Sequence, residues 1–125
     1  MTKIIVETSC DNSPKKEFLK QINVAFATGN VQFLKESIID NIVWNIIGDG
    51  KLEGKKSFIK KLDELQKGTI SELVLDQILT HGRSGAVNGI IKMKDGNKFS
   101  FSNFYEFNGA KASKIKSITS YVIAT

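Results

Sequence analysis

The sequence predicts a single α+β domain, in which helices from the first half of the chain pack on one face of a curved, mostly antiparallel sheet. Apolar residues of the first half recur every three to four positions, the period of an amphipathic helix. After Gly68 the sequence is typical of strands, and short turn sequences separate the segments. Helices segregated from an antiparallel sheet indicate an α+β domain. A chain of 125 residues has room for one core, so we expect residues 1–125 to form one domain.

Three helices are expected, at about residues 14–28, 31–37 and 55–65, after a strand or an arm at residues 1–10. Each carries apolar residues on one face and has sequence signals at its ends. The signals are an N-cap at Ser13 followed by Pro14, a terminating Gly29, a cap at Asn30 and a glycine, Gly54, before the third helix. The first two helices contain no chemical motif, so we interpret them as cover for a core.

Residues 39–47 are expected to form a strand covered on both sides, because apolar residues occupy both of its faces. The later strands form an antiparallel meander, at about residues 69–80, 86–94, 99–107 and 113–123. Turn sequences join them, and Asp95-Gly96 predicts a two-residue hairpin of type I′.

The net charge of +5 raises the question of a nucleic-acid partner, and the arrangement of the charges argues against one. The lysines occur in scattered pairs, such as Lys55-Lys56 and Lys60-Lys61, and acidic residues such as Asp63 and Glu64 interrupt them. Arg83 is the one arginine, although base recognition usually relies on arginine. We interpret the lysines as a solvated surface and expect no nucleic acid as a partner.

Membrane and secretory classes are not expected. Apolar runs such as Ile46-Ile47 are far shorter than the roughly 20 residues that span a bilayer. The segment from Met1 to Cys10 lacks the features of a signal peptide, so we expect a cytoplasmic protein. Cys10 is the one cysteine and has no partner for an internal disulfide, which fits a reducing compartment.

The stretch from Phe99 to Phe107 has two unlike faces. Its odd positions read Phe, Phe, Asn, Tyr, Phe, and its even positions read Ser, Ser, Phe, Glu. A strand therefore has an aromatic wall on one side and a mostly polar face on the other. Asn103 is the one amide in the wall, and Tyr105 is beside it. A buried amide needs a hydrogen-bond partner, so Asn103 is either a satisfied structural group or a group that faces a ligand.

Cofactor and nucleophile motifs are missing from the sequence. Gly48 and Gly50 lie between a strand and a helix, but the third glycine position of a dinucleotide fingerprint is Glu53, and no βαβ unit follows. No spacing of His, Cys and Asp matches a metal site, and no Gly-x-Ser-x-Gly motif occurs. We expect no cofactor and no metal.

Several short sequence features occur in an order that is typical of one superfamily. They are D-x-x-V-W-x-x-x-G at residues 40–48, Gly54-Lys55 before the third helix, Phe104-Tyr105-Glu106-Phe107-Asn108-Gly109, and Lys114-Ile115 leading to Ser120-Tyr121. From Pro14 to Ile123 the chain resembles the nuclear transport factor two-like superfamily, and within it SnoaL-like and ketosteroid isomerase-like proteins. The resemblance implies a cone-shaped fold, with three helices on the concave face of the sheet. It implies no single reaction, because this fold hosts isomerases, cyclases, dehydratases, hydrolases and non-catalytic proteins.

The resemblance also implies where a site would lie. The general base of the isomerases, an aspartate on the first long strand, corresponds to Asn45, and their second acid corresponds to Asn103. A tyrosine of their first helix corresponds to about Ile22. An amide does not accept a proton at useful pH, so we do not expect their enolisation chemistry here. Either amide could still hydrogen-bond a carbonyl or hydroxyl group of a ligand.

Four other side chains are candidates. His81 is the one histidine, the residue type that changes charge near neutral pH, and it would move protons if its face of the strand lines the cone. Otherwise His81 is a half-exposed turn residue. Trp44 and Asn45 are neighbours and point to opposite faces, and the resemblance favours Asn45 as the inward one. Tyr105 and Tyr121 are either ligand contacts or core aromatics with their hydroxyl groups at the rim.

Three functional hypotheses follow. The first is an enzyme with a pocket for a small apolar molecule that bears a carbonyl or hydroxyl group, in which His81 moves protons and Asn45, Asn103 and Tyr105 orient the ligand. The second is a non-catalytic ligand-binding or dimerisation module with the same cavity. The third, a nucleic-acid-associated protein, ranks last. Phe104 on the outer face of the sheet, together with the resemblance, predicts a homodimer through that face.

Overall fold

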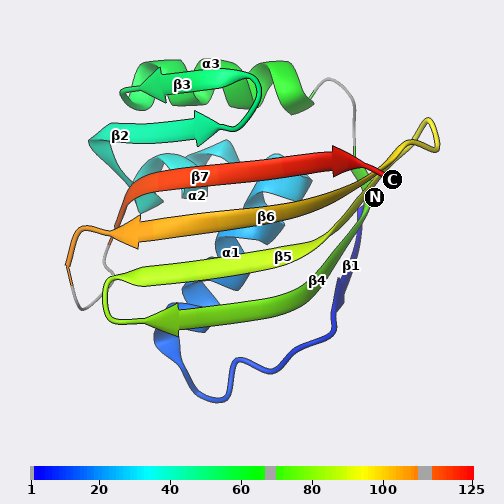
Figure 1. Cartoon of the computed structure of the whole chain (residues 1–125), viewed down its shortest axis with the longest axis horizontal. Coiled ribbons are helices and arrows are strands. Elements are labelled where there is room, and N and C mark those ends of the chain that lie inside the picture. The colour runs from blue at the N-terminus through cyan, green and yellow to red at the C-terminus, as the bar shows by residue number, and fades with distance from the viewer. Residues whose placement is uncertain (1, 67–69, 110–113) are drawn as a thin grey trace.

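The computed structural model describes residues 2–66, 70–109 and 114–125, which form three helices and one seven-stranded sheet (Figure 1). The helices are α1 (Pro14–Thr28), α2 (Val31–Ser37) and α3 (Lys55–Gln66). The strands are β1 (Lys3–Val6), β2 (Ile38–Ile46), β3 (Gly50–Glu53), β4 (Ile70–His81), β5 (Ser84–Met93), β6 (Lys98–Phe107) and β7 (Ile115–Ala124). The expected start points Thr69 and Ser113, and Ala110 of the last expected turn, lie outside the described residues.

The helix ends are those that the sequence predicts. The side chain of Ser13 accepts a hydrogen bond from the backbone N–H of Lys16 at 3.2 Å, and Pro14 opens α1. Gly29 ends α1 with a φ of 77°, a left-handed conformation that costs glycine little. The side chain of Asn30 caps α2 by accepting from the backbone N–H of Phe33 at 3.2 Å. The observed caps therefore confirm the boundary that the sequence predicts between α1 and α2.

The sheet is mostly antiparallel, as predicted, and has the strand order β1-β4-β5-β6-β7-β2-β3. β4 to β7 form the expected meander, and β7 then pairs in parallel with β2. The N-terminal segment, which the sequence left open as strand or arm, is a strand parallel to β4. β3 was not expected: the four residues after the turn at Gly48 pair back onto β2 instead of only leading to α3.

A bulge in β4 changes which side chains face inward. The pairing of β4 with β5 shifts register between Leu75 and Gln77, so Leu75 is buried whereas Gln77 is exposed. Opposite this bulge, a Cβ on Gly89 would lie 1.9 Å from the carbonyl oxygen of Val74, so this position has room only for glycine. An extra residue on one strand bends the sheet locally. The bulge therefore contributes to the curvature of the sheet, and the helices pack on its concave face.

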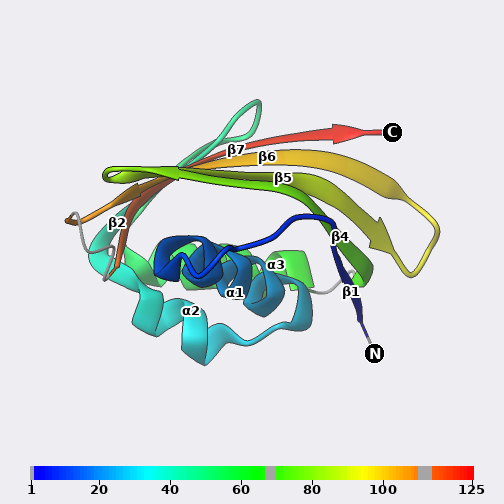
Figure 2. The same cartoon turned by 90° about the horizontal axis from the view of Figure 1, so that it is seen from below.

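The helices cover the concave face of the curved sheet and leave the opposite face uncovered (Figure 2). The core lies between these two layers, and its most deeply buried side chains come from α1, α3 and the inward positions of the strands. They include Leu19, Ile38, Ile42, Leu62, Leu75, Phe107 and Ile115. Phe107 and Ile115 are register partners and both are buried, so side chains fill the space between helices and sheet at this end. Any internal space must lie farther along the strands.

The turn of the β5–β6 hairpin differs from the turn that the sequence predicts. In the β5–β6 hairpin the N–H of Gly96 donates to the carbonyl of Met93, and of these turn residues only Gly96 has positive φ, 93°. A type I turn followed by a left-handed glycine fits this geometry, so the predicted two-residue type I′ turn is wrong.

None of the described helices is long and apolar enough to cross a membrane.

Candidate functional site

A cavity of about 400 Å³ lies between the helices and the concave face of the sheet. All three helices line it, with residues such as Ile22 of α1, Leu34 of α2 and Phe58 of α3. The sheet contributes the odd positions of β6, which include Phe99 and Phe101. The alternation along β6 therefore has the predicted result: its aromatic face turns toward the cavity. A space of this size accommodates a small organic molecule.

The cavity opens near the ends of α3 and β7. Two of the apolar lining residues there are partly exposed, Leu65 by 39% and Val122 by 50%. Beside them, Nζ of Lys61 on α3 lies 3.1 Å from Oδ2 of Asp49 in the β2–β3 turn. Both residues line the cavity, and their side chains are 24% and 60% exposed. The two charges compensate each other at the rim, and the other described residues that line the cavity carry no charge.

A line of hydrogen bonds crosses the sheet wall of the cavity. Nε1 of Trp44 donates to Oγ of Ser120 at 2.9 Å, and this hydroxyl donates to Oδ1 of Asn103 at 2.6 Å. The three residues lie on the neighbouring strands β2, β7 and β6. The tryptophan side chain can only donate, so it sets the direction of both hydrogen bonds. Ser120 accepts from Trp44 and donates its hydroxyl hydrogen to Asn103. The amide oxygen of Asn103 is thereby occupied, and its NH₂ group remains for other partners.

A second pair of polar groups lies deeper in the cavity. Nδ2 of Asn23 donates to the backbone carbonyl of Leu19 at 2.8 Å and to the hydroxyl oxygen of Tyr105 at 3.1 Å. Asn23 is 4% exposed and Tyr105 is 3% exposed. Burial raises the pKa of Tyr105 to about 12, and hydrogen bonds from Asn23 and Asn103 oppose this rise. Tyr105 therefore holds its proton at neutral pH.

Trp44, Asn103 and Tyr105, three of the six predicted site residues, line the cavity. Trp44 points inward together with its register partner Ile118, so Asn45 points to the outer face of the sheet beside Thr119. The expectation that Asn45 is the inward residue is therefore corrected. The alternation of β2 allows only one of the two neighbours to face the cavity.

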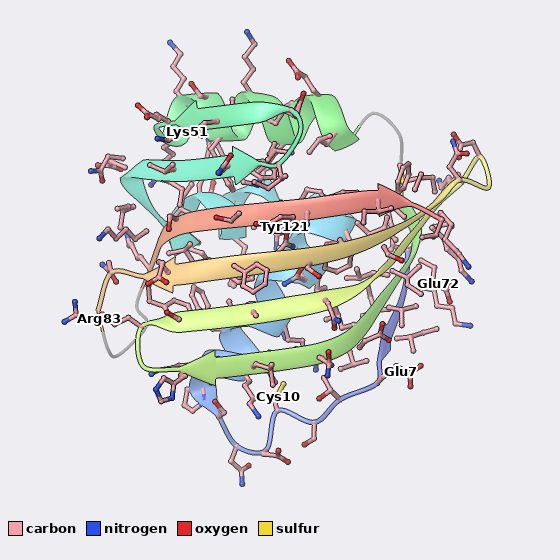
Figure 3. The ribbon with its side chains drawn as sticks, in the orientation of Figure 1. Glu7, Cys10, Lys51, Glu72, Arg83 and Tyr121 are labelled. Atoms are coloured by element: carbon pink, nitrogen blue, oxygen red, sulfur yellow. The ribbon has the colours of Figure 1, made fainter. Side chains whose placement is uncertain are left out.

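Tyr121 also lies outside the cavity, on the uncovered face of β7 (Figure 3). Tyr121 is 44% exposed, and its ring contacts the ring of Phe104 edge to face, with 5.9 Å between centroids. Along β7 the inward positions are Ile118, Ser120 and Val122, which line the cavity. Tyr121 lies between two of them in the sequence, so its side chain points to the opposite face of the sheet.

His81 is exposed at the end of β4, pairs with Ser84 across the hairpin, and does not line the cavity. Regular alternation predicts that His81 shares a face with Leu73 and Leu75, which are buried. The bulge after Leu75 reverses that parity, because one extra residue turns Leu79 and His81 to the other face. The catalytic role expected for His81 is therefore withdrawn.

Two central residues of the site were missed in the sequence, Asn23 and Ser120. Both carried a signal. Asn23 follows Ile22 on the apolar face of α1, where an amide is out of place, and Ser120 falls on the inward parity of β7 between Ile118 and Val122. Among the described residues, no group of three or more His, Cys, Asp or Glu side chains is placed to hold a metal ion.

Comparison with known proteins finds no matching family model and no matching curated protein. Solved structures do match. An NTF2-like protein of unknown function from Cytophaga hutchinsonii is 25% identical, with a TM-score of 0.68 over 87% of this chain and 99% of that one. A "putative SnoaL-like polyketide cyclase" from Shewanella denitrificans is 12% identical, with a TM-score of 0.76 over 90% of this chain and 92% of that one.

A "putative ketosteroid isomerase" from Kribbella flavida is also 12% identical, with a TM-score of 0.75 over 89% of this chain and 78% of that one. At such identities the likeness shows the fold and not the reaction. The curved sheet, the three helices on its concave face and these structural neighbours agree with the resemblance found in the sequence. The chain therefore has the NTF2-like fold, the fold of SnoaL-like and ketosteroid isomerase-like proteins.

Proposed function

We propose that this protein binds a small apolar molecule that bears a hydroxyl or carbonyl group, and that the ligand lies in the cavity between the helices and the sheet. One observation carries the proposal: a cavity of about 400 Å³ has an apolar lining into which neutral hydrogen-bonding groups, from Asn23, Asn103 and Tyr105, are set at one side. Apolar walls give affinity, and a few placed polar groups orient the ligand.

The names of two structural neighbours are consistent with this ligand class. One refers to a polyketide cyclase and the other to a ketosteroid isomerase, and a ketosteroid is an apolar molecule with a carbonyl group. Those names describe the neighbours. For this chain they support only the general chemistry of the proposed ligand, because the identities are 12%.

The cavity favours binding over the proton transfer of the isomerases. Of the positions that correspond to their two acids, Asn45 lies outside the cavity and Asn103 is an amide. Among the described residues that line the cavity, the ionisable ones are Asp49, Lys61 and Tyr105. Asp49 and Lys61 pair at the rim, and the raised pKa of Tyr105 keeps it a hydrogen-bond donor rather than a proton carrier.

The test is direct binding of a neutral, apolar, carbonyl-bearing fluorophore, 6-propionyl-2-(dimethylamino)naphthalene, whose emission shifts to the blue in apolar surroundings. We expect saturable binding and a blue shift. Val122→Trp should lower the affinity at least about tenfold, because Val122 lines the opening of the cavity.

Ile123→Trp is the matched control. Ile123 is the next residue, is 67% exposed and does not line the cavity. Equal affinities of the two variants would place the fluorophore elsewhere and contradict the proposal. Turnover of a carbonyl substrate that Asp49→Asn abolishes would instead favour an enzyme that uses the one carboxylate lining the described cavity.

We also propose that two copies of the chain pair through their uncovered sheet faces. The outward positions of β5, β6 and β7 between Glu106 at one end and Lys98 at the other carry no charge. They are Ala86, Asn88, Ile90, Ser100, Ser102, Phe104, Thr119, Tyr121 and Ile123. A quarter of the residues of the whole chain are charged, so an uncharged face of this extent is typical of an interface.

A second copy is the occupant that the charges of this face favour. Lys98 and Glu106 lie on the same face of β6, at its opposite ends, and Phe104 is 50% exposed between them. When two copies stack with their β6 strands antiparallel, Lys98 of each lies over Glu106 of the other. The same patch then complements itself, as a two-fold interface requires.

A further inference from the structure

The hydrogen bonds around Asn23 leave one of its atoms without a partner. Its NH₂ group is used twice, by the backbone carbonyl of Leu19 and by the hydroxyl oxygen of Tyr105. The carbonyl of Leu19 is only an acceptor, so the amide orientation is fixed and Oδ1 is the free end. No hydrogen bond to this oxygen is found among the described residues, and Asn23 is 4% exposed. Asn23 lines the cavity, and the cavity is where a partner would come from.

Tyr105 is in the converse situation, because it keeps a donor. Its hydroxyl oxygen accepts from Asn23, and it is also hydrogen-bonded by Asn103. Oδ1 of Asn103 already accepts from Ser120, so the NH₂ end of Asn103 is the one left to bond Tyr105. Two donors therefore meet the phenol oxygen. Its own hydrogen has no acceptor among the described residues and is left for a group in the cavity.

The free donor and the free acceptor are close enough to meet on one atom. The two ends of an amide group are about 2.2 Å apart, given its bond lengths. Nδ2 of Asn23 lies 3.1 Å from the hydroxyl of Tyr105, so Oδ1 lies at most about 5.3 Å from that hydroxyl. Two hydrogen bonds of about 2.7 to 2.8 Å each span that separation. A single hydroxyl oxygen can therefore accept from Tyr105 while its hydrogen is donated to Asn23.

We propose that Asn23 and Tyr105 form a subsite that recognises a neutral hydroxyl group of the ligand, in preference to a carbonyl or an ether. This rests on the proposed function and narrows it. A ketone or ether oxygen accepts from Tyr105 but has nothing to donate, so Oδ1 of Asn23 would become buried and unsatisfied. A carboxylate would in addition place its charge against that oxygen. An alcohol or phenol satisfies both residues.

The experiment compares matched probes that share one ring system. Calorimetry near pH 7 measures the affinities of 2-naphthol, which donates and accepts, of 2-methoxynaphthalene, which only accepts, and of 2-methylnaphthalene, which does neither. The naphthol should bind about tenfold tighter than the methyl ether, because only the naphthol satisfies the acceptor. Asn23→Leu should reduce this preference to less than about threefold without abolishing binding of 2-methylnaphthalene. Thr28→Ala, which removes an exposed hydroxyl from the same helix as Asn23 and away from the cavity, is the control and should retain the preference.

The outcomes separate the two proposals. Equal affinities of 2-naphthol and 2-methoxynaphthalene for the unmodified protein would overturn the hydroxyl subsite and leave the apolar binding site intact. A preference that persists in Asn23→Leu would also overturn it, because probe size and not Asn23 would then be the cause. Failure of all three probes to bind would overturn the proposed function itself. The comparison of probes on the unmodified protein does not depend on whether the variant folds.

Discussion

The hydroxyl of Tyr105 accepts a hydrogen bond from Nδ2 of Asn23 at 3.1 Å, across 82 positions of sequence. This contact joins α1 to β6, the elements that form opposite walls of the cavity. Both side chains are almost fully buried, so the contact is screened from water. It therefore fixes the helix layer on the sheet, and in the proposed subsite it leaves a donor and an acceptor for the ligand.

Replacing Tyr105 by Phe should alter how stability depends on pH. Burial raises the pKa of Tyr105 from 10.0 to about 12, so in alkali the unfolded chain loses this proton first. The stabilisation is complete below pH 10 and falls as pH rises toward 12, by about 2 kcal/mol at pH 11.5. Urea denaturation of both proteins at several pH values measures it. The lysines titrate in both, so a difference between them that stays constant from pH 8 to pH 11.5 would contradict the burial of this hydroxyl.

Ser120→Ala should destabilise the protein by about 1 to 3 kcal/mol, although it removes a single oxygen atom. That oxygen links Nε1 of Trp44 to Oδ1 of Asn103, and its loss leaves a buried donor and an acceptor without their partner. Urea denaturation measures the loss. Ser100→Ala is the matched control on the outer face and should change the free energy of unfolding by less than about 0.5 kcal/mol. Similar losses in the two variants would mean that the hydrogen-bonded line adds no stability.

Much of the fold was predictable because its signals are local. The caps at Ser13 and Asn30 and the stop at Gly29 act within one helical turn, and the alternation from Phe99 to Phe107 acts within one strand. These features predict the first two helices and the aromatic face that carries Asn103, and the structure confirms both. β3 is not predicted because its four residues include one apolar side chain, Leu52, and because pairing with β2, a tertiary contact, holds them in place.

The predicted site failed where one residue changes the parity of a strand. Alternation along β4 from Leu73 predicts an inward His81, but the bulge between Leu75 and Gln77 reverses the alternation and has no signal in the sequence. The resemblance favours Asn45 as the inward residue, whereas Trp44 is the one that faces the cavity. Asn23 is a polar residue on the apolar face of a helix, and Ser120 alternates with the apolar residues Ile118 and Val122, which line the cavity. Asn23, the amide on the apolar face of α1, lines the cavity, whereas Asn45, which corresponds to the base of the isomerases, does not.

His81→Ala should leave both ligand affinity and stability nearly unchanged. The side chain is exposed at the β4–β5 turn, does not line the cavity and makes no hydrogen bond or ion pair with other described residues. Fluorophore binding should stay within about twofold of the unmodified protein, and the free energy of unfolding within about 0.5 kcal/mol. A loss of affinity beyond tenfold would return His81 to the site and require a different arrangement of β4.

Charge reversal tests the proposed dimer and its orientation together. Glu106→Lys or Lys98→Glu alone should weaken dimerisation about tenfold, because each places like charges opposite each other in the antiparallel arrangement. The double variant Lys98→Glu/Glu106→Lys should recover the affinity of the unmodified protein. Analytical ultracentrifugation over a range of concentrations measures all four proteins. An unmodified protein that stays monomeric at high concentration contradicts the dimer, and single variants that dimerise normally contradict the antiparallel stacking.

Gly89→Ala should be far more costly than Gly85→Ala, although both glycines are buried on β5. A Cβ on Gly89 would lie 1.9 Å from the backbone carbonyl of Val74, whereas a Cβ on Gly85 would first meet the tip of the Leu19 side chain at 2.6 Å. A side chain can rotate away, but the carbonyl belongs to a paired strand. We expect losses of about 3 kcal/mol or more for Gly89→Ala and about 1 kcal/mol for Gly85→Ala by urea denaturation. Equal losses would show that β4 moves freely at its bulge, and the parity that turns His81 outward would then not be fixed.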